Sequence, residues 1–257
     1  MLSKNELERY DRQMLLDEIG QRGQELLKQA KVLIAGAGGL GSPSALYLAA
    51  AGVGTLKIID NDRVALSNLN RQILHGDDDI DRLKVDSARD RLVGLNSHIT
   101  VETVNDSITA ENAMALASGC DIMVDALDNI ETRFILNRTA VTLRIPFIHG
   151  AVSGFEGRAM TILPGESACL RCMHRGPAPA PEKFPVIGVA PGVIGAIQAT
   201  EAIKVLLNIG RPLLNRLMVY DGYNLTCREF RIKKNPQCDH CGQLQKGNRC
   251  EHHNQYS

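Results

Sequence analysis

This chain contains two pairs of cysteines whose spacing indicates metal binding. They are Cys169-Leu-Arg-Cys172 and Cys238-Asp-His-Cys241. Each C-x-x-C pair can bind one tetrahedral Zn²⁺ through two thiolates, so together they predict a four-cysteine site. Four sulfur ligands leave no open coordination position. We therefore expect a structural zinc that holds the C-terminal segment against the irregular loop after residue 163, with free thiols or a redox-active pair as alternatives.

A glycine-rich segment, Gly36-Ala-Gly38-Gly39-Leu-Gly41, is the second candidate for chemistry. Gly36 permits a tight turn, Gly38 lets the backbone approach phosphate oxygens, and Gly41 permits close helix–strand packing. The N-terminus of the helix that follows favours an anion. Asp60 ends the next apolar run, where a ribose-binding carboxylate is expected. The pattern predicts a nucleotide site, and alone its commonest interpretation is an NAD or FAD site.

Polar and basic residues further along the chain favour a triphosphate over a dinucleotide. They comprise Ser67, Asn68, Asn70, Arg71 and Lys84. Backbone N–H groups and a helix dipole usually suffice for a pyrophosphate, whereas the β- and γ-phosphates of ATP carry more charge and suit such cations. A position of Arg71 and Lys84 on solvated faces is the alternative, which their spacing alone does not reject.

The composition of the 257-residue chain is that of a soluble globular protein with one sizeable core: 44% of its residues are apolar and 23% charged. Lys plus Arg and Asp plus Glu total 29 each. The chain therefore has no net positive charge that would attract nucleic acid or an acidic membrane, and neither is expected as its main partner. We find no signal peptide and expect no membrane-spanning run of about 18 apolar residues. We predict a cytoplasmic protein, whose seven cysteines are metal ligands or free thiols.

The elements that position these residues alternate between strands and helices in the first half of the chain. Apolar runs predict strands at Lys31–Gly36, Thr55–Ile59, Ile99–Val104, Asp121–Asp125 and Ile145–His149. Helices are predicted at Ser42–Ala51, Lys84–Leu95, Ala110–Ser118 and Ile130–Leu143. This alternation with short connections predicts an α/β fold with a Rossmann-like, mostly parallel sheet and helices on both faces.

The pattern changes after about residue 150. A turn at Gly154–Gly157 precedes the predicted elements, which are strand Arg158–Leu163, irregular segment Cys169–Pro185, helix Val193–Asn208, and strands Leu217–Tyr220 and Thr226–Ile232. We expect these strands to extend the sheet in antiparallel fashion. The prediction is one domain over residues 1–245, with a nucleotide-binding half at about 28–150 and a second half at about 151–245. A disordered tail at 246–257 would follow.

On the last predicted helix, Glu201 and Lys204 are spaced as an exposed i,i+3 ion pair with no further role.

The order of these motifs resembles that of the ubiquitin-activating superfamily, and in particular of its HesA/MoeB/ThiF adenylyltransferases. The matching segments run from about Leu7 to Gly242: Arg9–Gln13, Gly36–Gly41, Asp60–Asp62, Ser67–Gln72, Lys84 and Asp125–Asn129. The zinc site of the family also matches the four paired cysteines. The resemblance therefore covers nearly the whole chain.

The resemblance implies an ATP-dependent reaction on a small ubiquitin-like sulfur-carrier protein that ends in Gly-Gly. The carrier's C-terminal glycine carboxylate attacks the α-phosphate of ATP, an acyl-adenylate forms, and pyrophosphate leaves. Arg71 and Lys84 fit the role of stabilising the charge that develops on the phosphate oxygens. Family relatives serve molybdopterin, thiamine, tRNA-thiolation, cysteine and siderophore pathways, and the sequence does not select one carrier.

The same resemblance implies a nucleotide-binding set: Gly36, Gly38, Gly39, Gly41, Asp60, Asp62, Ser67, Asn68, Asn70, Arg71, Gln72, Lys84, Asp128 and Asn129. Asp60 would accept from the ribose hydroxyls, and Asp128, supported by Asn129, would position Mg²⁺ and the triphosphate. A helix N-cap is a competing or additional role for Asp128. Arg12 resembles the family's finger residue, which enters the active site of the neighbouring subunit of a homodimer. A surface charge on an N-terminal helix is the alternative for Arg12.

One departure from the family limits the chemistry. Some relatives have a cysteine between the first zinc pair and the helix near residue 193 and use it for a persulfide or thioester step. The span Met173–Gly192 contains no cysteine. We therefore expect adenylation alone, with sulfur supplied by a separate donor protein.

Two other functions remain open from the sequence. The chain could be a family member that activates a tRNA-bound carboxylate, as the threonylcarbamoyl-adenosine dehydratases do, although its neutral net charge opposes a tRNA substrate. It could also be a nicotinamide oxidoreductase or a catalytically silent nucleotide-binding scaffold.

Overall fold

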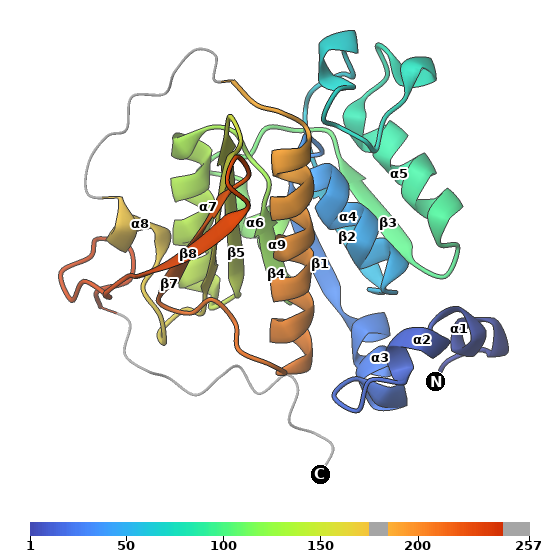
Figure 1. The fold of residues 1–257 in the computed structure, drawn as a ribbon, viewed down its shortest axis with the longest axis horizontal. Helices are drawn as coiled ribbons and strands as arrows, with labels where there is room; N and C mark the ends of the chain where they lie inside the picture. The colour runs from blue at the N-terminus through green and yellow to red at the C-terminus, as the bar shows by residue number, and fades with distance from the viewer. Residues whose placement is uncertain (175–184, 244–257) are drawn as a thin grey trace.

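One eight-stranded mixed sheet forms the centre of the computed structural model, which describes residues 1–174 and 185–243 (Figure 1). The strand order is β3-β2-β1-β4-β5-β6-β7-β8. The strands are β1 (Lys31–Ala35), β2 (Thr55–Ile59), β3 (Thr100–Val104), β4 (Ile122–Asp125), β5 (Phe147–Ser153), β6 (Glu156–Ile162), β7 (Arg216–Asp221) and β8 (Thr226–Arg231). Neighbours from β3 to β5 pair in parallel and those from β5 to β8 pair antiparallel. The predicted fold class is confirmed.

Helices cover both faces of the sheet. They are α1 (Lys4–Arg9), α2 (Asp11–Met14), α3 (Gly20–Gln29), α4 (Gly41–Ala50), α5 (Lys84–Leu95), α6 (Ala113–Ala117), α7 (Ile130–Leu143), α8 (Leu170–Met173) and α9 (Val189–Leu207). Alternate residues of β1 face opposite cores: Val32 and Ile34 pack with α4, α5 and α9, whereas Leu33 and Ala35 pack with α6 and α7. Because β1 is buried on both faces, its sequence is a continuous apolar run.

The predicted boundaries agree with the structure where an element is a regular, buried unit. Those of β2, α5 and α7 agree at both ends. β5 instead ends at Ser153 because it continues into a hairpin with β6. α9 begins at Val189, four residues earlier than predicted, because Pro191 is tolerated in the first helical turn, where no intrahelical N–H bond is needed. The predicted tail at 246–257 lies outside the described residues.

One helix of 19 residues, α9, is long and apolar enough, by length and composition, to cross a membrane. Its sequence is not a continuous run of about 18 apolar residues, because Glu201 and Lys204 interrupt it. In the structure, α9 packs against α4, β5 and β6 beside the central strands (Figure 1). Its apolar character is therefore explained by its place in the protein core.

The prediction of an exposed Glu201–Lys204 pair is wrong. Glu201 is 3% exposed. One carboxylate oxygen accepts from the backbone N–H of Leu213 at 2.6 Å and from the hydroxyl of Thr161, while the other contacts Lys204. Glu201 therefore joins α9 to β6 and to the segment before β7. The spacing of the two charges was that of a surface pair, but α9 turns this position towards the sheet.

Candidate functional site

A cleft of about 740 Å³ opens where β1, β2 and β4 end. The chain leaves β1 and β4 on opposite sides of the sheet, and such a switch point is where open α/β sheets bind ligands. The predicted residues that line the cleft are Gly36, Gly38, Gly39, Asp60, Asp62, Arg71, Gln72, Lys84, Asp128 and Asn129. The structure therefore brings together residues from both ends of the first half of the chain. The other predicted members, Arg12, Gly41, Ser67, Asn68 and Asn70, are not part of this lining.

Close backbone contacts explain two of the glycines. Gly36 has a φ of +102°, and a Cβ there would lie 2.7 Å from the carbonyl oxygen of Ala126. A Cβ on Gly41 would lie 1.9 Å from the carbonyl oxygen of Gly36. Gly41 is therefore needed behind the turn, where α4 meets β1, and not at the cleft surface. Together they leave the N-terminus of α4 directed at the cleft.

Asp60 supports the same turn from β2. Its Oδ2 accepts from the N–H of Ala37 at 2.8 Å, and its Oδ1 accepts from the N–H of Asp62 at 2.9 Å. The carboxylate is thus fixed in orientation beside the cleft.

His75 contacts the carbonyl of Ala37, the residue whose N–H Asp60 binds, and no motif in the sequence pointed to it. It is buried, with Nε2 3.0 Å from the Ala37 carbonyl oxygen and Nδ1 2.8 Å from Ser87 Oγ. Burial lowers the pKa of His75, which favours the neutral ring. A neutral imidazole can donate from Nε2 to Ala37 and accept at Nδ1 from Ser87.

The two predicted cations are held in different ways. Lys84 is 5% exposed, and its Nζ lies 2.7 Å from Asp62 Oδ2. Arg71 is half-buried and donates from Nη1 to the Ser67 carbonyl at 2.8 Å and to Asn70 Oδ1 at 2.9 Å. Ser67 and Asn70 thus lie behind Arg71 and orient it.

Asn129, and not Asp128, is the N-cap of α7. Its Oδ1 accepts from the N–H of Thr132 at 2.9 Å. The cap leaves Asp128 exposed on the cleft wall, with no polar side-chain contact in the part of the chain that the structure describes. Asn68 has a similar local role, since its Oδ1 accepts from the N–H of Ala65 at 3.1 Å.

Other cleft residues carried little sequence signal. They include Asp106, Ser107, Ile108, Arg133, Val152 and Pro191. The first three follow β3, and their position after a predicted strand could have placed them at this edge of the sheet. Arg133 and Pro191 lie on helices, and only the tertiary structure brings them to the cleft.

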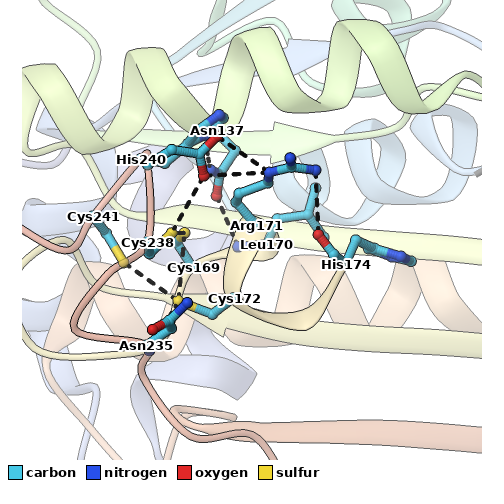
Figure 2. Close-up of polar contacts among 11 residues, drawn as sticks. Asn137, Cys169, Leu170, Arg171, Cys172, His174, Asn235, Cys238, His240 and Cys241 are labelled. Carbon is cyan, nitrogen blue, oxygen red and sulfur yellow. Dashed lines mark hydrogen bonds and ion pairs between the residues drawn. The ribbon is translucent and has the colours of Figure 1, made fainter. Parts of the chain in front are cut away.

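The four paired cysteines form a second, separate cluster (Figure 2). All four are buried, and their sulfur atoms lie within 4.8 Å of one another. The Sγ–Sγ distances are 3.9 Å for Cys169–Cys172, 3.6 Å for Cys169–Cys238 and 3.5 Å for Cys172–Cys241. Tetrahedral Zn–S bonds of about 2.3 Å require sulfur separations of about 3.8 Å. The hydrogen bond between Cys169 and Cys241 lowers the pKa of Cys169 and raises that of Cys241, so without a metal one thiolate is shared within the cluster.

Both cysteine segments are anchored to α7. Asn137 accepts from the N–H of Leu170 at 2.9 Å, and its Nδ2 lies 2.7 Å from His240 Nδ1 (Figure 2). Arg171 also reaches the other segment at Asp239, 3.3 Å away. His240 is thus engaged by Asn137 and is not part of the ligand cluster found in the described residues.

Arg12 lies on α2, which contacts the end of α4 remote from the cleft. It is exposed on α2, and its neighbour Gln13 donates to the carbonyl of Ala51 at 2.9 Å, just beyond the last residue of α4. α4 begins at the cleft and has ten residues, a length of about 15 Å. Arg12 is not part of the lining of the cleft of its own chain, and α2, which carries it, lies near the C-terminal end of α4 (Figure 1).

Comparisons with known proteins agree with this arrangement. The ThiF family model matches residues 10–240. A SAMP-activating enzyme E1 of Haloferax volcanii is 42% identical over 248 residues, which cover 94% of this chain and 91% of the relative. A sulfur carrier protein adenylyltransferase of Thermus thermophilus is 42% identical over 251 residues, covering 93% and 92%. A crystal structure of E. coli MccB with ATP has a TM-score of 0.82 at 25% identity, covering 91% of this chain and 74% of that one.

Proposed function

The chain belongs to the ThiF family, and we propose that it catalyses ATP-dependent adenylation of the C-terminal glycine carboxylate of a small ubiquitin-like sulfur-carrier protein. The observation that carries this proposal is that one cleft, at the switch point, gathers the glycine turn, Asp60, Arg71, Lys84 and Asp128. The names of the sulfur-carrier adenylyltransferase and of the SAMP-activating enzyme give the substrate class of the relatives.

The reaction forms one bond and breaks one. A carboxylate oxygen of the carrier attacks the α-phosphorus of ATP, the bond from that phosphorus to the bridging oxygen breaks, and pyrophosphate leaves with the electron pair. The glycine turn and the N-terminus of α4 direct N–H groups at the phosphates. Asp60, oriented by Ala37, would accept from the ribose hydroxyls. Arg71 and Lys84 would stabilise the negative charge that grows on the phosphate oxygens.

Asp128 is the residue we propose for Mg²⁺. Mg²⁺ prefers oxygen ligands and is usually held by one or two carboxylates together with substrate phosphates, and an exposed carboxylate on the cleft wall fits that donor set. When bound, Mg²⁺ would neutralise phosphate charge beside Arg71 and Lys84.

We propose that the four-cysteine cluster binds a structural Zn²⁺. Its sulfur separations fit a tetrahedral ion, and its residues are buried on the α7 face of the sheet, apart from the cleft lining. The site would hold the segment after β8 against α7 and α8 and would take no part in adenylation.

Arg12 supports a homodimer as the active form. Because it lies away from its own cleft, we propose that it acts in the cleft of a second copy. Beside α2, a shallow groove of about 310 Å³ is lined by Gln13, Tyr47, Ala196 and Ile203. Tyr47 is 59% exposed there, and a second subunit would cover this apolar surface.

The absence of a cysteine from Met173–Gly192 supports adenylation without a covalent sulfur step on this chain. We propose that a separate protein donates sulfur to the adenylate, and that the reaction takes place in the cytoplasm.

Pyrophosphate exchange tests the proposed function. With Mg²⁺-ATP and labelled pyrophosphate, label should enter ATP only when a small carrier ending in Gly-Gly is added. The matched control is the same carrier without its last glycine, which should support no exchange. Absence of exchange with every such carrier contradicts the proposal. Exchange stimulated by tRNA would favour the tRNA-bound carboxylate, and NADH binding without ATP binding would favour an oxidoreductase.

A further inference from the structure

A buried ionic network lies directly under the cleft. Asp125, the last residue of β4, is 0% exposed. Its Oδ2 lies 2.6 Å from Nδ1 of His149 on β5, and its Oδ1 lies 3.4 Å from Nε of Arg133 on α7. Burial lowers the pKa of His149, which favours a neutral ring that donates from Nδ1 to Asp125. Arg133 is therefore the cation that balances the Asp125 carboxylate.

Arg133 also binds backbone on two sides of the cleft floor. Its Nη2 donates to the carbonyl of Leu127 and, at 3.0 Å, to the carbonyl of Gly150. Leu127 directly precedes Asp128, and Gly150 lies in β5. One guanidinium thus joins the segment that presents Asp128 to the neighbouring strand.

The strands beneath this segment are fixed independently. Gln198 of α9 donates from Nε2 to the carbonyls of Asp125, at 2.7 Å, and Ile148, at 3.2 Å. A Cβ on Gly150 would lie 2.4 Å from the Gln198 side chain, so the packing here is close. Gly150 is therefore a rigid anchor for Arg133.

The Asp128 segment has far fewer supports. Asp125 Oδ1 accepts from the N–H of Leu127 at 3.2 Å, and Asn129 caps α7. Because the Asp128 side chain has no polar partner in residues 1–174 and 185–243, its place depends on the backbone on either side. On the N-terminal side, Asp125 joins Leu127 to β4, and the Arg133–Leu127 bond joins it to Gly150 of β5.

We propose that Arg133 is a positioning residue for adenylation: paired with Asp125, it fixes the Leu127 carbonyl and thereby holds the Asp128 carboxylate where Mg²⁺ and the triphosphate are bound. This inference rests on the proposed function. It predicts that the loss of the Arg133 bonds weakens nucleotide binding only when Mg²⁺ is present, because an Asp128 carboxylate displaced by about 1 Å would no longer be placed to bind Mg²⁺.

The test measures the affinity for ATP with Mg²⁺ and with EDTA, by calorimetry on the full-length protein. The parent should bind ATP more tightly with Mg²⁺. Arg133→Lys keeps the charge beside Asp125 but cannot span both carbonyls. The factor by which Mg²⁺ increases its affinity for ATP should be roughly tenfold smaller than in the parent, the size expected for one lost charged hydrogen bond. Arg138→Lys, an exposed arginine on the same helix, is the matched control and should bind as the parent does.

A double variant separates positioning from a purely structural role. If Arg133 acts through Asp128, Arg133→Lys should weaken Mg²⁺-ATP binding no further in an Asp128→Ala background. Additive losses overturn the inference. The inference is also overturned if Mg²⁺ increases the ATP affinity of Arg133→Lys as much as that of the parent and only the melting temperature falls. It is overturned as well if Mg²⁺ does not increase the ATP affinity of the parent. Arg133→Gln is the second variant if Arg133→Lys does not fold, and failure of both to fold assigns Arg133 to the core alone. A parent that binds no ATP contradicts the proposed function instead.

Discussion

At the scale of single residues, the cleft uses a buried lysine and a half-buried arginine, and these two cations differ in what holds them. Lys84 is in contact with the exposed carboxylate of Asp62, whereas Arg71 is oriented by neutral acceptors of its own segment. When an anion arrives, Lys84 can exchange Asp62 for a phosphate oxygen, while Arg71 is already oriented without a counter-charge.

Substitution of Lys84 should affect chemistry more than folding. Lys84→Ala removes a cation that we expect to contact the triphosphate, and carrier-dependent pyrophosphate exchange should fall by roughly 10²–10³-fold. The melting temperature should stay close to that of the parent, because Asp62 is exposed and remains solvated. Lys233→Ala, at an exposed position, should exchange as the parent does. An active Lys84→Ala protein would remove Lys84 from the proposed site.

The buried histidines predict a pH dependence of stability. Burial lowers the pKa of His75 and His149 below 6.5 in the folded protein. As pH falls below 6.5, the unfolded chain takes up protons before the folded one, so the free energy of unfolding should decrease. The slope is at most about 1.4 kcal/mol per pH unit for each histidine. Urea unfolding at pH 7.5 and 5.5 measures it, and His75→Gln should reduce the difference. An unchanged difference would exclude His75 as a source.

At the scale of elements, α7 serves both sites. Its first turn carries Arg133 at the cleft, and Asn137, one turn later, holds Leu170 and His240 beside the cysteine cluster. The cysteine cluster and the cleft floor therefore share one helix.

Loss of the metal should lower stability without removing a catalytic group. Cys172→Ser should release zinc, measured by elemental analysis, and lower the melting temperature by about 10 °C. Cys227→Ser, on the exposed face of β8, should keep both. Equal zinc content in the two variants would contradict a four-cysteine site.

Gly188, the residue before α9, packs closely against the backbone of Asn70 and Arg71. A Cβ on Gly188 would lie 2.2 Å from the carbonyl oxygen of Asn70. Gly188→Ala should therefore displace the segment that carries Arg71 and reduce exchange by about tenfold or more, with the fold retained. Gly192→Ala lies on α9 in open space and should be neutral or slightly stabilising. Equal activity of the two variants would show that the Asn70 segment yields freely.

The sequence predicted elements well where one physical rule dominates. β1 is buried on both faces and β2 and α7 have clear end signals, so their ranges follow from local residues. The N-terminal helices were not given bounds, and Glu201 was placed on the surface, because the side of α9 that meets the sheet is set by the tertiary structure. The cleft glycines, Asp60 and the cysteine pairs belong to motifs of fixed spacing, so the sequence alone could identify them. Arg133 and His75 belong to no such motif, because the residues that they contact lie elsewhere in the sequence.

At the scale of the whole molecule, the cleft lies at one end of α4, and Arg12 lies beside the other end. A complete site on our proposal therefore needs two copies. Arg12→Ala and Lys84→Ala should each be inactive, yet a mixture allowed to exchange subunits should regain carrier-dependent pyrophosphate exchange, because the mixed dimer has one site with both residues intact. A mixture as inactive as its components, although shown to form mixed dimers, would place Arg12 outside catalysis.

The central place of α9 also sets the order in which the protein can be completed during synthesis. β1 to β5 are all made before residue 154, but α9, which packs against β4, β5 and α4, ends only at Leu207. Until then the surfaces of those elements that α9 covers stay exposed, and Gln198 cannot yet join β4 to β5. The nascent chain therefore leaves this side of its nucleotide half open to chaperones until residue 207 has been translated.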